Sequence, residues 1–204
     1  MNILSLFDGI SCGQQALERA NITIDNYYSS EIDKHAIAVT QHNYPKTIQV
    51  GDVCKLSSKD LPKIDMLIGG SPCQGFSQSG KGLNFNDPRS KLFFEYVRLL
   101  KECQPTYFLL ENVVMKKEWQ DVISGYLRVA PVKINSALVS AQNRNRLYWS
   151  NIKIKQPKDR HVMLWNILED LPFTNEPDYT YWRSDTTINK NHPKYRTLRV
   201  GGAW

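Results

Sequence analysis

Short apolar runs alternate with helix-forming stretches over the first half of the chain. The apolar runs lie at residues 3–7, 26–31, 48–50, 64–68 and 107–110, and helical patterns lie at 14–20, 34–42 and 90–103. Strands and helices that alternate at this interval are typical of an α/β fold with a doubly wound, mostly parallel sheet. Ligands of such folds bind at the carboxyl ends of the strands.

Each predicted strand ends at a polar residue or a glycine. Asp8, Glu31, Asp52, Cys73 and Glu111 follow the five runs in order, so a parallel sheet would bring them to one edge. One acid at a strand end is usually a helix cap or a solvated turn. Acids at several successive ends favour a nucleotide-like ligand, with Glu31 placed to bind ribose hydroxyls.

The pattern weakens beyond residue 151, where prolines, aromatic residues and polar residues dominate around one helix-like stretch at 163–171. We therefore expect one domain over residues 1–155 and a different region over residues 156–204. The 204-residue chain is 41% hydrophobic and 23% charged, which is enough to bury a core. It has no apolar run of the roughly 18 residues that a membrane span needs and no signal peptide, which favours a cytoplasmic protein.

Charge and cysteine content narrow the classes of partner. The net charge is +6, and residues 116–160 hold ten Lys or Arg against three acids. Such a segment is either a surface for a polyanion such as nucleic acid or an ordinary solvated face. The four cysteines lack CxxC spacing and the histidines lack ligand-like spacing, so neither a metal site nor a disulfide framework is expected.

The most specific motif is the octapeptide at residues 70–77, GSPCQGFS. A proline stiffens the turn that presents Cys73, and Gly75 lets the following backbone approach a ligand. A lone cysteine at a strand end is usually a small buried hydrophobe. The surrounding octapeptide, however, resembles the catalytic motif of cytosine-5 DNA methyltransferases.

Two further motifs occur in the order found in that family. Residues 111–113, ENV, resemble its second catalytic motif, and residues 142–146, QNRNR, resemble its Gln-x-Arg-x-Arg motif. The resemblance extends over residues 2 to about 155. The residues of these motifs are most similar to those of the mammalian de novo enzymes and their phage and bacterial relatives. It implies a Rossmann-like methyltransferase that uses S-adenosyl-L-methionine.

The resemblance also implies a covalent mechanism on a cytosine that has been flipped out of duplex DNA. Cys73 would attack carbon 6 of the base, and Glu111 would stabilise the charge that develops toward nitrogen 3. Arg144 and Arg146 lie in an extended segment and are expected to face opposite sides. Arg146 would reach oxygen 2 of the cytosine, and Arg144 would support the Cys73 loop or a phosphate.

The same resemblance assigns the binding residues. The cofactor's methionine end would meet the turn at residues 7–13, its ribose Glu31, and its adenine Asp52 and the adjacent valine. The implied cofactor site comprises Phe7, Asp8, Gly9, Ile10, Cys12, Gly13, Glu31, Ile32, Asp52, Val53, Pro72 and Leu92. The loop at 74–91 is either a lid that closes over DNA or an ordinary surface loop. The implied DNA contacts are Gln74, Ser77, Lys81, Arg89 and Asn112.

The chain departs from the family pattern at two places. Residues 9–13, GISCG, replace the usual Gly-x-Gly-Gly, and the 204 residues do not include the family's target-recognition domain or its final motif. We therefore expect a truncated recognition region and little activity from the chain alone, with a homodimer or a complementing carboxyl-terminal polypeptide as partner. The alternatives are a transfer-RNA cytosine-5 methyltransferase and a regulatory subunit of a split methyltransferase.

Overall fold

The computed structural model describes residues 1–72 and 88–163 together with the backbone of 195–196, and the side chains of 88–90 are not part of the description. The chain groups into two units. The first comprises Met1–Lys133 and Leu147–Ile154, and the second comprises Ile134–Arg146 and Lys155–Trp204. The second unit thus contains the segment 134–146 as well as the residues after Ile154.

The main sheet has seven strands in the order β3-β2-β1-β4-β5-β8-β6. The pairs β2–β3, β1–β2, β1–β4 and β4–β5 are all parallel, which confirms the predicted mostly parallel, doubly wound sheet. The strand bounds are β1 (Asn2–Leu6), β2 (Asn26–Ser30), β3 (Ile48–Gln49), β4 (Met66–Gly69), β5 (Tyr107–Val113), β6 (Val132–Asn135) and β8 (Asn145–Ser150).

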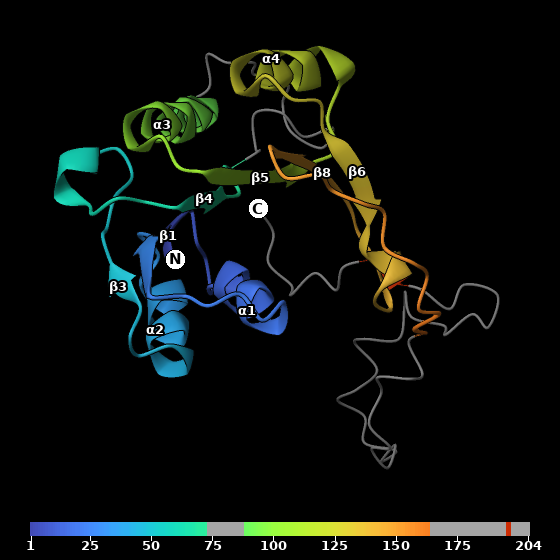
Figure 1. Ribbon diagram of the computed structural model, residues 1–204. Coiled ribbons are helices and arrows are strands. Elements are labelled where there is room, and N and C mark those ends of the chain that lie inside the picture. The colour runs from blue at the N-terminus through green and yellow to red at the C-terminus, as the bar shows by residue number, and fades with distance from the viewer. Residues whose placement is uncertain (73–87, 164–194, 197–204) are drawn as a thin grey trace, which may run out of the picture. The chain divides into compact units, whose positions relative to one another are not determined.

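Helices cover both faces of this sheet in the first unit. Figure 1 shows α1 and α2 on one side of β1 and β4, and α3 and α4 on the other. A parallel sheet needs this double cover because each connection between neighbouring strands crosses a face. The bounds are α1 (Cys12–Arg19), α2 (Lys34–Asn43), the 3-10 turn η1 (Ser58–Asp60), α3 (Pro88–Cys103) and α4 (Lys117–Leu127).

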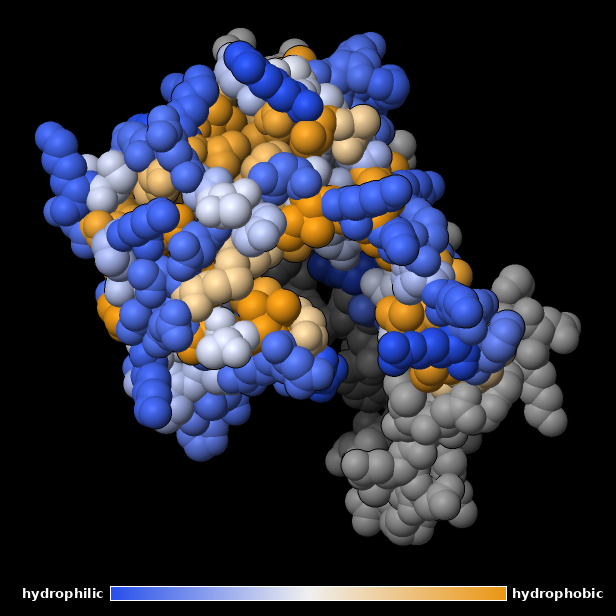
Figure 2. All heavy atoms as spheres, in the orientation of Figure 1, coloured by the Kyte–Doolittle hydropathy of each residue, from blue (hydrophilic) through white to orange (hydrophobic). Residues whose placement is uncertain are grey.

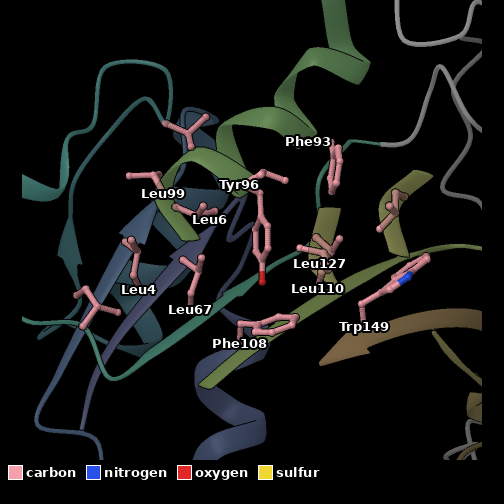
Figure 3. Packing of buried hydrophobic residues seen from close by; sticks show 14 of the residues in the cluster. Leu4, Leu6, Leu67, Phe93, Tyr96, Leu99, Phe108, Leu110, Leu127 and Trp149 are labelled. Carbon is pink, nitrogen blue, oxygen red and sulfur yellow. The ribbon is translucent and has the colours of Figure 1, made fainter. Parts of the chain in front are cut away.

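The larger core lies between the sheet and the α3–α4 layer. Leu4, Leu67 and Leu110 are fully buried on this face, and Tyr96 reaches them from α3 (Figure 3). Gly69 allows α3 to approach, because a Cβ there would lie 3.1 Å from the Tyr96 ring and 3.1 Å from the Leu6 carbonyl oxygen. The end of β4 thus packs closely against α3, and a side chain at position 69 would require its neighbours to shift.

The α3–α4 layer carries an aromatic contact near the surface. The ring centroids of Phe94 and Tyr126 are 5.3 Å apart in an edge arrangement. Tyr126 is nearly half exposed, and Figure 2 shows a hydrophobic area over these two helices between hydrophilic side chains. Below them, the buried Trp149 of β8 donates from Nε1 to the Ser124 hydroxyl at 2.9 Å.

Strand β5 is longer than predicted. The prediction that it ends at Leu110 is wrong, because the strand continues through Glu111 and Asn112 to Val113. Successive side chains of a strand point to opposite faces, so Glu111 and Asn112 point apart. Their burial follows this alternation: Asn112 is buried with Phe108 and Leu110, and Glu111 is half-buried with Leu109.

The described part of the second unit is small. It contains the 3-10 turn η3 (Ser136–Leu138) and a two-stranded parallel sheet of β7 (Gln142–Asn143) and β9 (Tyr195–Arg196). Residues 164–171 of the expected helix lie outside the described residues. Among the helices that the structure describes, none combines the length and apolarity that a membrane span requires.

Candidate functional site

The carboxyl ends of β1, β2 and β4 lie in one row with the middle of β5. Leu6 pairs with Ser30 on one side and with Gly69 on the other, and Gly69 pairs with Leu110. The next residue after each of these four therefore lies at the same edge of the sheet. These residues include Glu31 after β2 and Glu111 on β5. Three strand spacings of about 4.8 Å separate these two strands, or roughly 14 Å.

Asp8 is the centre of a hydrogen-bond network in the turn after β1. Its Oδ1 accepts from the Ser5 hydroxyl at 2.5 Å and from the Tyr27 hydroxyl at 2.8 Å. Its Oδ2 accepts from the hydroxyl of Ser11, which is fully buried. Burial, followed by the Asp8 charge, raises the pKa of Tyr27 well above its usual range. Tyr27 therefore remains a donor at neutral pH.

This network accompanies an unusual backbone. Phe7, Gly9 and Ser11 all have left-handed φ values of 55°, 58° and 59°. For residues other than glycine this conformation costs about 1–2 kcal/mol each. Hydrogen bonds to a charged group contribute about 1.5–3 kcal/mol each. The three hydroxyls on Asp8 are therefore sufficient to hold the strained turn at Phe7 and Ser11.

Glu31 joins this turn to the end of β2. Its Oε2 accepts from the Gly9 N–H at 2.7 Å, and its Oε1 accepts from the N–H groups of Ile32 and Asp33 at 2.8 and 2.9 Å. A carboxylate has about four acceptor sites, so these bonds leave room for about one more donor, on Oε2. That capacity matches a single hydroxyl group of a ligand.

The turn leaves open space at Gly9. Its carbonyl oxygen accepts from the Thr40 hydroxyl at 3.3 Å, so both backbone groups of this residue are held. A Cβ built on Gly9 meets nothing within 4 Å. The backbone is thus fixed and accessible, as required where a ligand approaches the chain closely. The neighbouring Ile10 and Ile32 are 51% and 75% exposed beside it.

The end of β3 forms the outer part of the edge. The Ser30 hydroxyl donates to the Gly51 carbonyl at 2.7 Å, and Asp52 Oδ1 accepts from the Cys54 N–H at 3.0 Å. Arg98 of α3 fixes this segment, because its Nη2 donates to the Val53 carbonyl at 2.9 Å. The Val53 side chain itself is buried in the core.

Other predicted cofactor residues differ in their surroundings. Gly13 packs α1 against the sheet, because a Cβ there would lie 2.5 Å from Ile68 Cδ1 and 3.0 Å from the Tyr27 hydroxyl. Cys12 is exposed at the start of α1. Pro72 and Leu92 are half-buried, and Leu92 packs against the core. Gly13 and Leu92 therefore have evident packing roles.

Glu111 lies directly against the end of β4. A Cβ built on Gly70 would be 3.2 Å from Glu111 Oε2, so the carboxyl group occupies the space above this glycine. Gly70 begins the segment Gly70-Ser71-Pro72, and Cys73 follows it in the sequence. The predicted acid is thereby next to the backbone that leads into the predicted nucleophile.

Asn112 holds the same segment from the other face of β5. It is 2% exposed, and its Nδ2 donates to the Ser71 hydroxyl at 3.2 Å and to the Ser71 carbonyl at 3.4 Å. Its Oδ1 accepts from the Val113 N–H at 2.8 Å. A buried amide with these partners favours a role in positioning Ser71 over the DNA contact that the sequence predicts.

Arg144 and Arg146 belong to the second unit, and the hydrogen bonds given below join them to other residues of that unit. Arg144 lies between β7 and β8, where its N–H donates to Asn135 Oδ1 at 3.1 Å. Arg146 Nη1 donates to the Asn145 carbonyl at 2.8 Å. Residues two apart in a strand share a face, so the expected opposite orientation does not follow from strand geometry. Both side chains are half-buried.

Several predicted site residues lie outside the described residues. These are Cys73, Gln74, Ser77 and Lys81 and the side chain of Arg89, together with the proposed lid up to residue 87. The sequence analysis did not identify Ser5, Ser11, Tyr27 and Thr40. The signal for two of them is the spacing Ser5-x-x-Asp8-x-x-Ser11. No group of three metal-binding side chains occurs among the residues that the structure describes.

Comparisons of the sequence with known proteins identify a family and individual proteins that are similar to this chain. Residues 1–122 match the family described as C-5 cytosine-specific DNA methylase. An orphan methyltransferase of Bacillus phage SPR is 38% identical over 169 residues, which is 75% of this chain and 38% of that protein. A type II methyltransferase of Lactococcus lactis subsp. cremoris is 35% identical over 191 residues, or 83% of this chain and 49% of that protein. The chain thus spans less than half of these two curated relatives.

Solved structures agree with the sheet described above. The crystal structure of a putative DNA modification methyltransferase encoded within an E. coli prophage aligns with a TM-score of 0.62 and 28% identity, over 78% of this chain and 51% of the other. A mutant of Spodoptera frugiperda DNMT2 aligns with a TM-score of 0.64 and 23% identity, over 84% and 60%. The second similarity establishes only the fold.

Proposed function

The chain belongs to the C-5 cytosine-specific DNA methylase family, and on this premise we propose that it methylates carbon 5 of cytosine in double-stranded DNA with S-adenosyl-L-methionine as methyl donor. The observation that carries the proposal is the position of Glu111, whose Oε2 lies 3.2 Å from where a Cβ of Gly70 would stand. This position brings an acid to the segment that leads into Cys73. The glycine turn around Gly9 lies at the same sheet edge.

The residues at this edge fit the proposed cofactor. Gly9 has both backbone groups held and no atom within 4 Å of its Cβ position, which leaves room for a ligand against the turn. Glu31 retains about one acceptor site for a ribose hydroxyl. The exposed Ile32 offers an apolar surface for an adenine ring. When bound, S-adenosyl-L-methionine would supply the methyl group that carbon 5 receives.

The protein's own groups would prepare the cytosine. The Cys73 thiolate would donate its electron pair to carbon 6, which raises the electron density at carbon 5. Glu111 would hold a proton at nitrogen 3, where the negative charge develops. After methyl transfer a base removes the proton from carbon 5, and the bond between Cys73 and carbon 6 breaks. Arg146 is proposed to contact oxygen 2 and Arg144 to support the Cys73 loop.

The DNA would be bound in an extruded form, because carbon 6 is not accessible within a stacked duplex. Lys81 and Arg89 are proposed phosphate contacts, with Gln74 and Ser77 beside the flipped base. The positive charge of residues 116–160 would add a salt-dependent attraction to DNA. A second copy or a complementing polypeptide remains a proposed partner, since the chain spans less than half of the two curated relatives described above.

Methyl incorporation tests this function. The full chain would be incubated with labelled S-adenosyl-L-methionine and either mixed-sequence duplex DNA or transfer RNA, with and without the polypeptide encoded downstream. We expect label at carbon 5 of cytosine in the duplex, and none after Cys73→Ser. Label in transfer RNA alone would overturn the DNA assignment. No label on either substrate, with the downstream polypeptide present, would overturn the activity itself.

A further inference from the structure

The turn that fits the cofactor rests on a tyrosine from the neighbouring strand. Tyr27 is 2% exposed, and its hydroxyl donates to Asp8 Oδ1 at 2.8 Å. It also lies 3.0 Å from where a Cβ of Gly13 would stand, so it is enclosed below the start of α1. We propose that Tyr27 is a positioning residue for the cofactor turn, which it holds in its ligand-accepting form through Asp8.

The connection from Tyr27 to the ligand space passes through two residues. Asp8 gathers the hydroxyls of Tyr27, Ser5 and Ser11 and precedes Gly9 in the left-handed part of the turn. The Gly9 N–H then donates to Glu31 at 2.7 Å. Loss of the Tyr27 hydroxyl would remove one of the two side-chain donors to Asp8 Oδ1 and leave the Ser5 hydroxyl, so the carboxyl group and the turn at Gly9 would be held less firmly.

A direct contact between Tyr27 and the cofactor does not fit this geometry. The Tyr27 side chain belongs to the small core cluster with Ile3 and Ile68, on the face that α1 covers. Gly9, by contrast, has open space at its Cβ position. Tyr27 is therefore separated from that space by the Asp8 turn and by α1. Its high pKa keeps the hydroxyl protonated, so its influence should not vary with pH near neutrality.

The neighbouring residue provides a matched control. Tyr28 lies next to Tyr27 in β2 but packs against the other core cluster, on the opposite face of the sheet. Tyr27→Phe and Tyr28→Phe remove the same atom from adjacent positions. Only Tyr27→Phe should weaken cofactor binding, by about 10- to 150-fold, which is the loss expected for a hydrogen bond to a charged group.

The experiment is a double-mutant cycle on cofactor binding by the full chain. Calorimetry would give the Kd for S-adenosyl-L-methionine of the unaltered chain, Tyr27→Phe, Asp8→Ala and the combined variant, with urea unfolding to establish that each is folded. If Tyr27 acts through Asp8, Tyr27→Phe should change the Kd less than twofold in the Asp8→Ala background, where the acceptor oxygen is absent. Ser5→Ala, which removes another donor to the same Asp8 oxygen, replaces Tyr27→Phe if that variant does not fold.

The outcomes separate this inference from the proposed function on which it rests. No binding by the unaltered chain would contradict the proposed cofactor and the inference together. Normal binding by a folded Tyr27→Phe variant would overturn the inference alone. Effects of Tyr27→Phe and Asp8→Ala on the Kd that multiply in full would show that Tyr27 acts independently of Asp8, which also overturns the inference.

Discussion

Removal of the Asn112 side chain should disable the site without abolishing the fold. Asn112→Ala deletes two bonds from Nδ2 to Ser71, of 3.2 and 3.4 Å, and one from the Val113 N–H to Oδ1, of 2.8 Å. Ser71 is buried and lies two residues before Cys73 in the sequence. We therefore expect the loss to affect both stability and the alignment of the catalytic segment.

The size of each effect can be worked out from these contacts. Net contributions of about 0.5–1.5 kcal/mol for each hydrogen bond, with the two longer ones near the lower limit, give about 1.5–2.5 kcal/mol of lost stability. A displacement of about 1 Å at a catalytic segment can lower a rate by about 100-fold. We expect kcat/KM to fall by that order, with the cofactor Kd little changed.

Asn151→Ala is the matched control. Asn151 also bonds the backbone around β5, where its Oδ1 accepts from the Phe108 N–H at 3.0 Å and its Nδ2 donates to the Thr106 carbonyl at 2.8 Å. These bonds lie at the amino end of the strand, away from Gly70. This variant should lose about 1–2 kcal/mol of stability and retain its activity.

The assay combines urea unfolding with initial rates of methyl transfer at saturating S-adenosyl-L-methionine. Both variants would be measured at a temperature where unfolding curves show each to be fully folded. The reasoning is refuted if Asn112→Ala keeps kcat/KM within twofold of Asn151→Ala. In that case Asn112 would serve only to stabilise β5.

Three further predictions concern single positions. Glu31→Ala should weaken cofactor binding by about 1–3 kcal/mol in calorimetry, because it removes the acceptor of the Gly9 N–H; an unchanged Kd in a folded variant would contradict the proposed pocket. Gly70→Ala should lower kcat about tenfold while the cofactor Kd stays constant, since the added Cβ lies 3.2 Å from Glu111 Oε2; a normal kcat would separate Glu111 from the chemistry. Tyr96→Phe should leave stability unchanged or raise it by up to about 1 kcal/mol, since its buried hydroxyl has no partner among the described residues; a clear loss in urea unfolding would reveal a bonded water.

The sheet was predictable because its strands are short apolar runs with clear ends. The runs at 3–7, 26–31 and 64–68 fall within two residues of β1, β2 and β4. The end of β5 was missed because Glu111 and Asn112 are polar, and an apolar pattern stops at the first polar residue. Their place in the strand depends on Gly70 and Ser71, which only the folded chain brings alongside.

The hydroxyl network around Asp8 was missed for a similar reason. In the sequence, Tyr27 is an ordinary residue of a predicted strand. No sequence pattern connects it with Asp8, which lies 19 positions earlier. The link follows from the register, because Ile3 pairs with Tyr27 in adjacent parallel strands. Sequence spacing could have indicated Ser5 and Ser11, which stand three residues before and after Asp8, but not the partner from β2.

The covalent step is the central claim and can be measured directly. Duplex DNA with 5-fluorocytosine should trap the active protein, because the fluorine cannot be removed from carbon 5 as the proton is. Incubation with S-adenosyl-L-methionine, proteolysis and mass spectrometry would then locate the adduct. We predict a stable adduct on Cys73 that is absent after Cys73→Ser. An adduct on Cys12, Cys54 or Cys103, or efficient methyl transfer by the Cys73→Ser variant, would contradict the account.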